Sequence, residues 1–535
     1  MNYELTEEVV CKQKSEIMDT ERYQVHLDDE QCDIWDNDCT ILTGFKLPKM
    51  LIGCHLMPTC SNISLCISED IPEKRKKVSI SLRSNLSLSS FVQSIQKFWN
   101  KNSNFSDNGF EIICYPFKVC VVKNFIENGK FLDKLRQDIY DLKFHLRTMD
   151  LYEFFQSRDL QYLSGDRITA IYDLLRKDVL NWVSSITGYN LSHISATISL
   201  YTNTDYLLVH DDQREDRMVA FILYLMDETG WQKNNGGCLQ LLNKDSDGQP
   251  SDIVYDIAPS NNQFIFFPVT NESYHQVGEI VGMDKYRLSI NGWFHIKKPP
   301  IFSAPSYKPS NKSLYSDNYF NAKTVDIELE SWINDEYLEY KVIRSVQSYI
   351  EETSQVSLKQ FLKDESFTEI LTTLESTGIV WEKMGPPNRL LYETAQLENV
   401  PYVLEQFFNL FQSTAMFQLL HDYTDLDLDK AGASMKYELQ KWTPGSYALL
   451  TDYDWKKRNE LDLIMYFGCG KRGDIVGAST QYVATEDEVQ QALVTIEPED
   501  NSLNIVYRDS ARFTKYFSLQ SRCRYFYLFI CSYVE

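Results

Sequence analysis

The chain has 535 residues and a mass of 62.5 kDa, which is too long for one ordinary domain and predicts about three or four. Its 43% hydrophobic residues are enough for a substantial core, which excludes a wholly disordered chain. The 76 acidic against 53 basic residues give a net charge of −23, which disfavours generic coating of nucleic acids and favours a basic partner. Neither a membrane-spanning apolar run nor a signal peptide is evident, so we expect a soluble, intracellular protein.

The first hundred residues differ in composition from the rest. Six of the 12 cysteines fall in this part, but none forms the close C-x-x-C pair that is typical of zinc sites. The basic run at residues 72–77 fits either a nuclear import signal or an ordinary solvated loop. We expect residues 1–105 to form a variable, partly disordered extension with reduced thiols.

Residues 106–298 carry the patterns of strands and helices. Short strands are expected at residues 112–115 and 119–122, then a helix at 131–142 and a longer amphipathic helix at 168–186. From residue 195 to 296, short strand-like runs dominate, separated by turn signals. Helices followed by many short strands predict a mainly β sandwich or barrel with flanking helices.

The C-terminal part repeats this pattern. Residues 299–324 have the composition of a linker, and residues 325–535 contain a helical region followed by strands. The run from Tyr447 to Thr451 resembles the run from Tyr206 to His210, which predicts two related β-domains in one chain. Chance similarity between short apolar strands is the alternative.

Four residues form an ordered set that carries chemistry. His210 and Asp212 are two positions apart at the end of a strand-like run, so their side chains project to the same face. His275, just past a later strand, would complete a set of two histidines and one carboxylate, which suits non-haem Fe(II) and leaves coordination positions open. Arg287 opens another strand-like run, and a guanidinium there suits bidentate pairing with a carboxylate.

Other motif matches carry less weight. His26-Leu27-Asp28 has the same spacing as the first pair but no strand before it, so we interpret it as a chance match. Residues 468–473 fit G-x-G-x-x-G, yet no helical pattern follows, which predicts a hairpin loop and not a dinucleotide site. Structural zinc at the triad is disfavoured because such sites prefer four closed ligands. The remaining histidines are expected to be ordinary core or surface residues.

The sequence around these residues resembles a known enzyme family. Residues 209–225, 274–277 and 287–295 are similar to 2-oxoglutarate- and iron-dependent oxygenases. They are most similar to the prolyl 3-hydroxylases that modify a small-subunit ribosomal protein at the decoding centre. The resemblance covers roughly residues 106–535 and implies two tandem double-stranded β-helix (jelly-roll, cupin-like) domains. The first, at 106–298, would be catalytic, and the second, at 325–535, would be degenerate and non-catalytic.

The resemblance also implies cofactors. His210, Asp212 and His275 would bind one Fe(II), and Arg287 would pair with the distal carboxylate of 2-oxoglutarate. O2 would be the other co-substrate, and ascorbate the reductant.

Further site residues follow from the same resemblance. Tyr224, Tyr201 and Ser289 would contact the co-substrate, although an ordinary core tyrosine and an ordinary strand serine remain alternatives for Tyr201 and Ser289. In the second domain, Thr451 and Tyr453 stand where His210 and Asp212 stand in the first. No metal site is therefore expected in the second domain.

The resulting functional hypothesis is a monomeric prolyl 3-hydroxylase of the nucleus and cytoplasm. It would act on a basic ribosomal protein and affect translation accuracy and termination, with termination partners bound by the C-terminal domain. Neither membrane association nor sequence-specific nucleic-acid binding is expected. Two alternatives stay open: an oxygenase with another protein substrate, and an interaction protein of the translation machinery whose C-terminal domain is its main functional part.

Overall fold

The structure is a computed structural model of the chain. It describes residues 41–42 and 79–535, apart from 215, 228–229, 299, 301, 304, 306, 308–318, 452–458 and 487–488. All of these residues belong to one compact unit, Thr40–Glu535. Within this described part, no helix is long and apolar enough to cross a membrane. The six N-terminal cysteines, the basic run at 72–77, the triplet at 26–28 and Tyr453 lie outside the described residues.

A sheet of 14 strands forms the first domain, with the order β11-β10-β13-β8-β6-β7-β14-β9-β12-β4-β3-β2 and with β1 and β5 attached at β6. Its strands are β1 (Ile41–Leu42), β2 (Phe105–Asp107), β3 (Phe110–Ile113), β4 (Val119–Val122), β5 (Phe144–Thr148), β6 (Tyr152–Gln156), β7 (His193–Tyr201), β8 (Tyr206–His210), β9 (Arg217–Tyr224), β10 (Leu239–Lys244), β11 (Pro250–Ile257), β12 (Phe264–Pro268), β13 (His275–Val277) and β14 (Arg287–His295).

The first sheet folds over on itself. Val121, Tyr224 and Phe267, from strands near one end of the order, share a buried apolar cluster with Leu241 and Ile257 from strands at the other end. Side chains from opposite ends of one sheet meet only when the sheet curls around a common interior. The domain is therefore a double-stranded β-helix with an apolar interior, as the sequence predicts.

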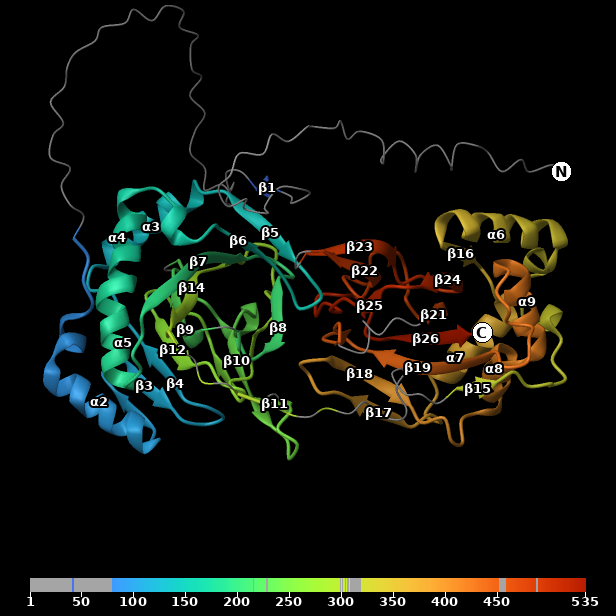
Figure 1. Ribbon diagram of the computed structural model, residues 1–535, viewed down its shortest axis with the longest axis horizontal. Coiled ribbons are helices and arrows are strands. Elements are labelled where there is room, and N and C mark those ends of the chain that lie inside the picture. The colour runs from blue at the N-terminus through green and yellow to red at the C-terminus, as the bar shows by residue number, and fades with distance from the viewer. Residues whose placement is uncertain are drawn as a thin grey trace, which may run out of the picture. The chain divides into compact units, whose positions relative to one another are not determined.

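Helices cover the outer face of the central strands (Figure 1). They are α2 (Ser89–Lys101), α3 (Gly129–Tyr140), α4 (Asp166–Leu174) and α5 (Leu180–Thr187), and a π-helical turn, Leu175–Val179, joins the last two. The long helix predicted at 168–186 thus forms, with Ile171, Leu175 and Trp182 buried in the same core as Ile198 and Ile290 of β7 and β14. The expected period of apolar residues carries through the π-turn because its buried side chains stay on one face.

The first domain begins earlier than the sequence suggests. Helix α2 buries Ile95 and Trp99 in the domain's core, and β2 spans the expected boundary at residue 106. Residues 79–105 are therefore part of the folded domain and not of an extension. The sequence does not predict this helix, because the stretch is rich in serine and only a narrow stripe of α2 is apolar.

A second sheet of 12 strands forms the C-terminal domain, in the order β16-β24-β21-β26-β19-β18-β20-β25-β22-β23, with β15 and β17 attached. Its strands are β15 (Phe320–Asn321), β16 (Gln355–Lys359), β17 (Trp381–Met384), β18 (Leu390–Ala395), β19 (Ser434–Trp442), β20 (Tyr447–Ala448), β21 (Glu460–Phe467), β22 (Thr480–Glu486), β23 (Val489–Ile496), β24 (Ser502–Arg508), β25 (Ala511–Thr514) and β26 (Phe526–Val534). Helices α6 (Tyr340–Thr353), α7 (Asp364–Leu374), α8 (Tyr402–Gln412) and α9 (Thr414–Thr424) share its larger apolar core.

The two domains share the order of their central strands. Strand β26 lies between β19 and β21, just as β14 lies between β7 and β9. The G-x-G-x-x-G segment, residues 468–473, connects β21 to β22 as a loop without a following helix. The chain therefore contains two tandem jelly rolls.

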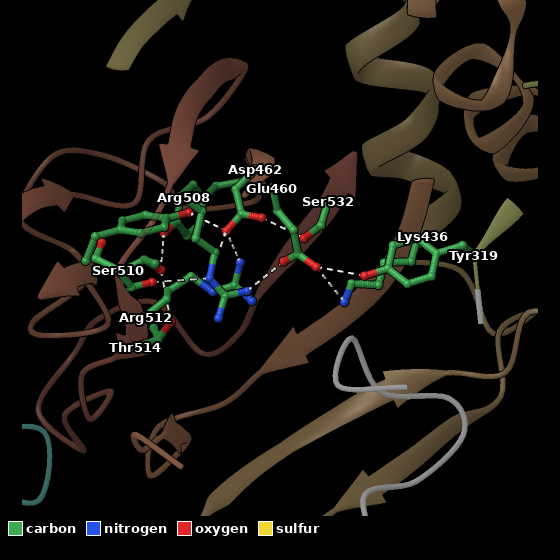
Figure 2. Close-up of polar contacts among 12 residues, drawn as sticks. Tyr319, Lys436, Glu460, Asp462, Arg508, Ser510, Arg512, Thr514 and Ser532 are labelled. Atoms are coloured by element: carbon green, nitrogen blue, oxygen red, sulfur yellow. Dashed lines mark hydrogen bonds and ion pairs between the residues drawn. The ribbon is translucent and has the colours of Figure 1, made fainter. Parts of the chain in front are cut away.

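Charged side chains are buried within the second sheet (Figure 2). Asp462 has no exposed area, pairs with Arg512, and accepts hydrogen bonds from the Tyr482 hydroxyl at 2.8 Å and the Ser532 hydroxyl at 2.6 Å. Burial opposes ionisation of Asp462, but the nearby guanidinium groups and these hydrogen bonds lower its pKa below the usual value. Glu460, two residues earlier, pairs with a lysine and an arginine, both at 3.1 Å.

Strand β8 packs directly against the second domain. Tyr206 and Leu208 lie in one buried cluster with Tyr447, Leu449 and Tyr516, and the rings of Tyr206 and Tyr516 are 4.6 Å apart. The strand that ends at His210 is thus supported by side chains of the C-terminal domain.

Candidate active site

Three predicted metal ligands meet at the end of β8. His210 ends this strand, and His275 begins the neighbouring β13 as its direct register partner, with ring centroids 4.2 Å apart. Asp212 lies just beyond β8 in a left-handed backbone conformation, φ 64°. Its two carboxylate oxygens lie 3.5 Å from His210 Nε2 and 3.4 Å from His275 Nε2.

The backbone fixes the protonation of both imidazoles. His210 Nδ1 lies 2.8 Å from the Leu208 carbonyl, and His275 Nδ1 lies 2.7 Å from the Ser273 carbonyl. Because a carbonyl oxygen can only accept, each Nδ1 donates, so Nε2 is the nitrogen that binds a metal when the ring is neutral. Both Nε2 atoms face the same carboxylate, which is the arrangement that orients histidines for a metal ion.

The carboxylate of this triad is charged. Burial opposes its ionisation, but contact with His210 and His275 lowers the pKa of Asp212 well below its usual value. Two neutral imidazoles and one carboxylate form the facial set typical of non-haem Fe(II), with the remaining positions open. The donor set therefore fits the iron implied by the sequence.

A buried guanidinium lies deeper in the barrel. Arg287 is 2% exposed, and its centre lies 4.9 Å from the ring centroids of both Tyr201 and Tyr224. Its Nη2 donates to the Tyr224 hydroxyl at 3.2 Å, whereas its Nε has no hydrogen-bond partner among the described residues. No carboxylate of the described residues pairs with Arg287. A buried cation without a counter-ion fits an anionic co-substrate such as 2-oxoglutarate.

Serine hydroxyls line the same strands. Ser289, two residues after Arg287 on the same face, is fully buried and lies opposite both Tyr224 and Ser199. The Ser199 hydroxyl is buried without a partner among the described residues. The structure thus gathers Arg287, Tyr224, Tyr201 and Ser289 and adds Ser199, which sequence reasoning missed. Its place opposite Ser289 becomes visible only once the strand register is known.

Two glycines before β10 allow close approaches of the backbone, one to Glu279 and the other to Arg287. A Cβ on Gly236 would lie 1.7 Å from the carbonyl oxygen of Glu279, and one on Gly237 would lie 2.5 Å from Ile280 and 3.2 Å from Arg287 Cδ. Gly237 also has φ 66°, a conformation that side chains rarely adopt. The turn signal read from the sequence therefore marks a close backbone approach to the guanidinium.

A second arginine, also missed from the sequence, lies on the iron side. Arg217 Nη1 is 3.9 Å from Asp212 Oδ1, and its guanidinium stacks on Trp293 at 3.5 Å from the ring centroid. Arg217 thereby helps to hold the Asp212 carboxylate oxygen that also contacts His210.

Another group of two histidines and a carboxylate occurs in the described part of the first domain. His295 Nδ1 lies 2.7 Å from Asp216, and His193 Nε2 lies 3.6 Å from the same carboxylate. The two rings, however, stack in parallel, 4.5 Å apart with an interplanar angle of 10°. In two rings stacked face to face, the nitrogen electron pairs lie in separate parallel planes and do not converge on one ion. These residues form a hydrogen-bonded group in which His193 is exposed and His295 is buried, in line with ordinary core or surface histidines.

The second domain has replaced the site residue by residue. Ala448 is the counterpart of Leu207, because the run from Tyr447 resembles the run from Tyr206. Leu207 pairs with Val277, and Ala448 pairs with Thr514. Two residues before these partners stand His275 in the first domain and Arg512 in the second. Tyr466 takes the place of Tyr224, and it pairs with Leu528 as Tyr224 pairs with Ser289. Two residues before these partners stand Arg287 in the first domain and the fully buried Phe526 in the second. Both metal-type groups among the described residues belong to the first domain.

Two family models match this chain. Residues 196–295 match the 2OG-Fe(II) oxygenase superfamily, and this range contains all the candidate site residues. Residues 326–535 match a model described as the oxoglutarate and iron-dependent oxygenase degradation C-terminal domain. The first match lies within the first jelly roll, and the second covers nearly all of the second.

Curated relatives and solved structures are similar to the chain. Prolyl 3-hydroxylase sudestada1 of Drosophila melanogaster is 35% identical over 462 residues, with 80% of this chain and 85% of the relative covered. Prolyl 3-hydroxylase OGFOD1 of Mus musculus is 31% identical over 519 residues, with 84% and 93% covered. A solved prolyl-4-hydroxylase of Pseudomonas putida is 19% identical, with a TM-score of 0.25 and coverage of 31% of this chain and 84% of that structure.

Proposed function

Because the chain belongs to the prolyl 3-hydroxylases of the 2-oxoglutarate- and Fe(II)-dependent oxygenases, we propose that it hydroxylates C3 of a proline in a small-subunit ribosomal protein at the decoding centre. The observation that carries the catalytic part is the convergence of His210, Asp212 and His275 in the same jelly roll as the buried Arg287, which has no counter-ion among the described residues. The net charge of −23 supports a basic protein as substrate.

Each side chain of the site has a distinct task. His210, Asp212 and His275 would hold Fe(II) on one face, while Arg287 would bind the distal carboxylate of 2-oxoglutarate. When bound, iron with 2-oxoglutarate and O2 supplies the oxidising chemistry that hydroxylates an unactivated C–H bond, and ascorbate serves as reductant. The protein's own contribution is to orient these groups and to exclude water.

The tyrosines around Arg287 keep this region dry. Tyr201 is 3% exposed and stacks on Phe154, with ring centroids 4.7 Å apart. Burial raises the pKa of Tyr201, so its hydroxyl stays protonated at neutral pH. A neutral donor beside a guanidinium adds to the binding of an anionic co-substrate and contributes no competing negative charge.

A peptide assay tests the proposed substrate. The full chain with Fe(II), 2-oxoglutarate and ascorbate is incubated with a peptide spanning the decoding-centre loop of the small-subunit ribosomal protein, and the peptide mass is followed. We expect a gain of one oxygen, located on C3 of proline by fragmentation, and none with His210→Ala. Turnover of 2-oxoglutarate without a mass gain in this or any other ribosomal peptide would remove the ribosomal substrate and leave the oxygenase.

We propose in addition that the C-terminal domain binds partners of translation termination and that the protein works in both nucleus and cytoplasm. The domain keeps a complete jelly roll although Arg512 and Phe526 have replaced its site, which supports a role in binding. A His210→Ala chain that restores termination accuracy in cells lacking the protein would favour this role over catalysis. A chain that fails to restore it would assign the effect to hydroxylation.

A further inference from the structure

A separate cavity of about 580 Å³ opens beside the co-substrate residues. It lies between β11, which is one edge of the first sheet, and strands β3 and β4 near the other edge. Among the described residues that line it, Glu111, Asp227 and Asp256 bring carboxylates and Lys123 brings the one cation. Apolar or aromatic side chains form much of the wall: Ile113, Val121, Met226, Trp231, Tyr255 and Ile257. None of the candidate iron or co-substrate residues lines this cavity.

Two polar atoms in the cavity wall lack partners. Gln263 is 4% exposed, and its Oε1 is buried with no hydrogen-bond partner among the described residues. Asn261 Oδ1, two residues earlier, is in the same state. Buried acceptors are rarely left unpaired, because each loses its hydration without compensation. Both residues line the cavity, so a ligand whose donors reach these oxygens would supply the missing hydrogen bonds.

The cavity is connected to the active site by hydrogen bonds on one side and by paired strands on the other. The Tyr224 N–H donates to the Gln263 carbonyl at 2.9 Å, and the Tyr224 hydroxyl accepts from Arg287. On the other side, Tyr255 is the register partner of Leu241, which is the register partner of His275. Neighbouring strands are about 4.8 Å apart, so the cavity wall lies roughly 10 Å from the strand that carries an iron ligand.

A lysine or arginine side chain has the chemistry that this cavity requires. Its aliphatic stem suits the apolar wall, and its charged N–H groups suit both the carboxylates and the unpaired amide oxygens. We propose that the cavity receives a basic side chain of the substrate polypeptide. An extended chain advances about 3.3 Å per residue, so that side chain belongs to a residue within about three positions of the target proline. This inference rests on the proposed function and specifies its substrate.

Matched enzyme and peptide variants test the pairing. The double variant Glu111→Gln with Asp256→Asn removes two charges and keeps size and hydrogen-bonding capacity. In the decoding-centre peptide, each lysine or arginine within three residues of the proline is replaced in turn by norleucine. We expect the double variant to raise the KM of the unmodified peptide about tenfold with kcat little changed.

A double-mutant cycle decides the result. One norleucine peptide is expected to show the same raised KM with wild-type and variant enzyme, because the interaction is already lost. If, for every peptide, the enzyme variant and the norleucine substitution raise KM by factors that multiply, the two changes act independently, and the inference is overturned. Asp252→Asn is the control, since this exposed carboxylate lies on the same strand β11 outside the cavity, and it should leave KM unchanged.

Failure of the proposed substrate is distinguishable from failure of the cavity. If the wild type hydroxylates no such peptide, N-acetyl-lysine methylamide replaces it as a probe in saturation-transfer NMR. A signal with the wild type that disappears in the double variant would support a site for basic side chains. An equal signal with both proteins, or no signal with either, would overturn it.

Discussion

Backbone carbonyls fix the chemistry of the candidate site at the scale of single residues. The carbonyls of Leu208 and Ser273 hold the Nδ1 atoms of His210 and His275, so the Nε2 atoms are free for a metal without any change of tautomer. Arg287 is prepared in a similar way, between two tyrosine rings and without a counter-ion among the described residues. Such preorganisation lowers the entropic cost of binding iron and co-substrate.

The geometry of Arg287 predicts a selective defect in co-substrate binding. Arg287→Lys keeps the charge but loses the planar, bidentate donor set. We expect the KM for 2-oxoglutarate to rise about tenfold to a hundredfold, measured by succinate formation, with Fe(II) binding unchanged. Arg176→Lys is the matched control, because Arg176 is 44% exposed and contacts only neighbouring residues of its own helical segment among the described residues, Asp173 and Tyr172. An unchanged KM in Arg287→Lys would contradict the assignment.

Asp205 predicts a pH dependence of stability. Burial raises the pKa of Asp205 to about 7, although hydrogen bonds from Thr202 partly oppose this. The folded protein therefore binds a proton that the unfolded chain, with a pKa of about 4, has already released, and stability falls as pH rises from about 4 to about 7. Asp205→Asn should flatten this dependence in denaturant unfolding measured across that range. An unaltered slope would show that Asp205 is not the group responsible.

At the scale of elements, the site depends on strands that the sequence predicts and on contacts between strands that the sequence does not predict. The spacing of two residues on β14 placed Arg287 with Ser289, because strand periodicity is local. Asp212 reaches His210 in another way, since it lies beyond the end of β8 in a left-handed backbone conformation that the sequence pattern did not predict. The cavity wall and Ser199 could not be foreseen, since they depend on the register between strands that are distant in sequence. Helix α2 was missed because its apolar stripe is narrow within a Ser-rich stretch.

The turn before β10 gives a prediction at this scale. Gly237→Ala places a methyl group against Ile280 and Arg287 in a left-handed conformation, so we expect a loss of about 2–4 kcal/mol in unfolding free energy and a raised KM for 2-oxoglutarate. Gly188 has a similar φ of 77° with nothing within 4 Å of the added methyl group. Gly188→Ala should therefore cost only about 1 kcal/mol and leave KM unchanged. Equal effects of the two substitutions would contradict the close approach.

At the scale of the whole molecule, the same fold occurs twice, with different side chains at the positions that form the site in the first domain. The first barrel keeps an acidic and imidazole-lined site, while the second fills the corresponding positions with Phe526 and with the ion pair of Arg512 and Asp462. Sequence comparison identified the loss at Thr451 and Tyr453, but the replacement of His275 by an arginine required the strand pairing. The second domain thus keeps its fold with structural polar groups in place of a cofactor.

The buried network of the second domain predicts a large effect on stability. Asp462→Ala leaves Arg512 buried without its counter-ion, and breaking such a pair costs about 3–5 kcal/mol. The control is Glu499→Gln, which breaks an exposed pair with Lys359 and should change stability by less than about 1 kcal/mol. Chemical denaturation of both variants measures the difference. A cost for Asp462→Ala as small as that of the control would exclude a structural role for the network.

The most direct test of the account is the source of the oxygen atom in the product. The full chain with Fe(II), 2-oxoglutarate and the decoding-centre peptide is incubated under isotopically heavy O2, and the modified proline is located by mass spectrometry. The account predicts one heavy oxygen on the proline ring, formed together with succinate, and no product with His210→Ala or Asp212→Asn. Iron-independent turnover, or a product oxygen that comes from water, would contradict the assignment of His210, Asp212 and His275 as the centre that activates O2.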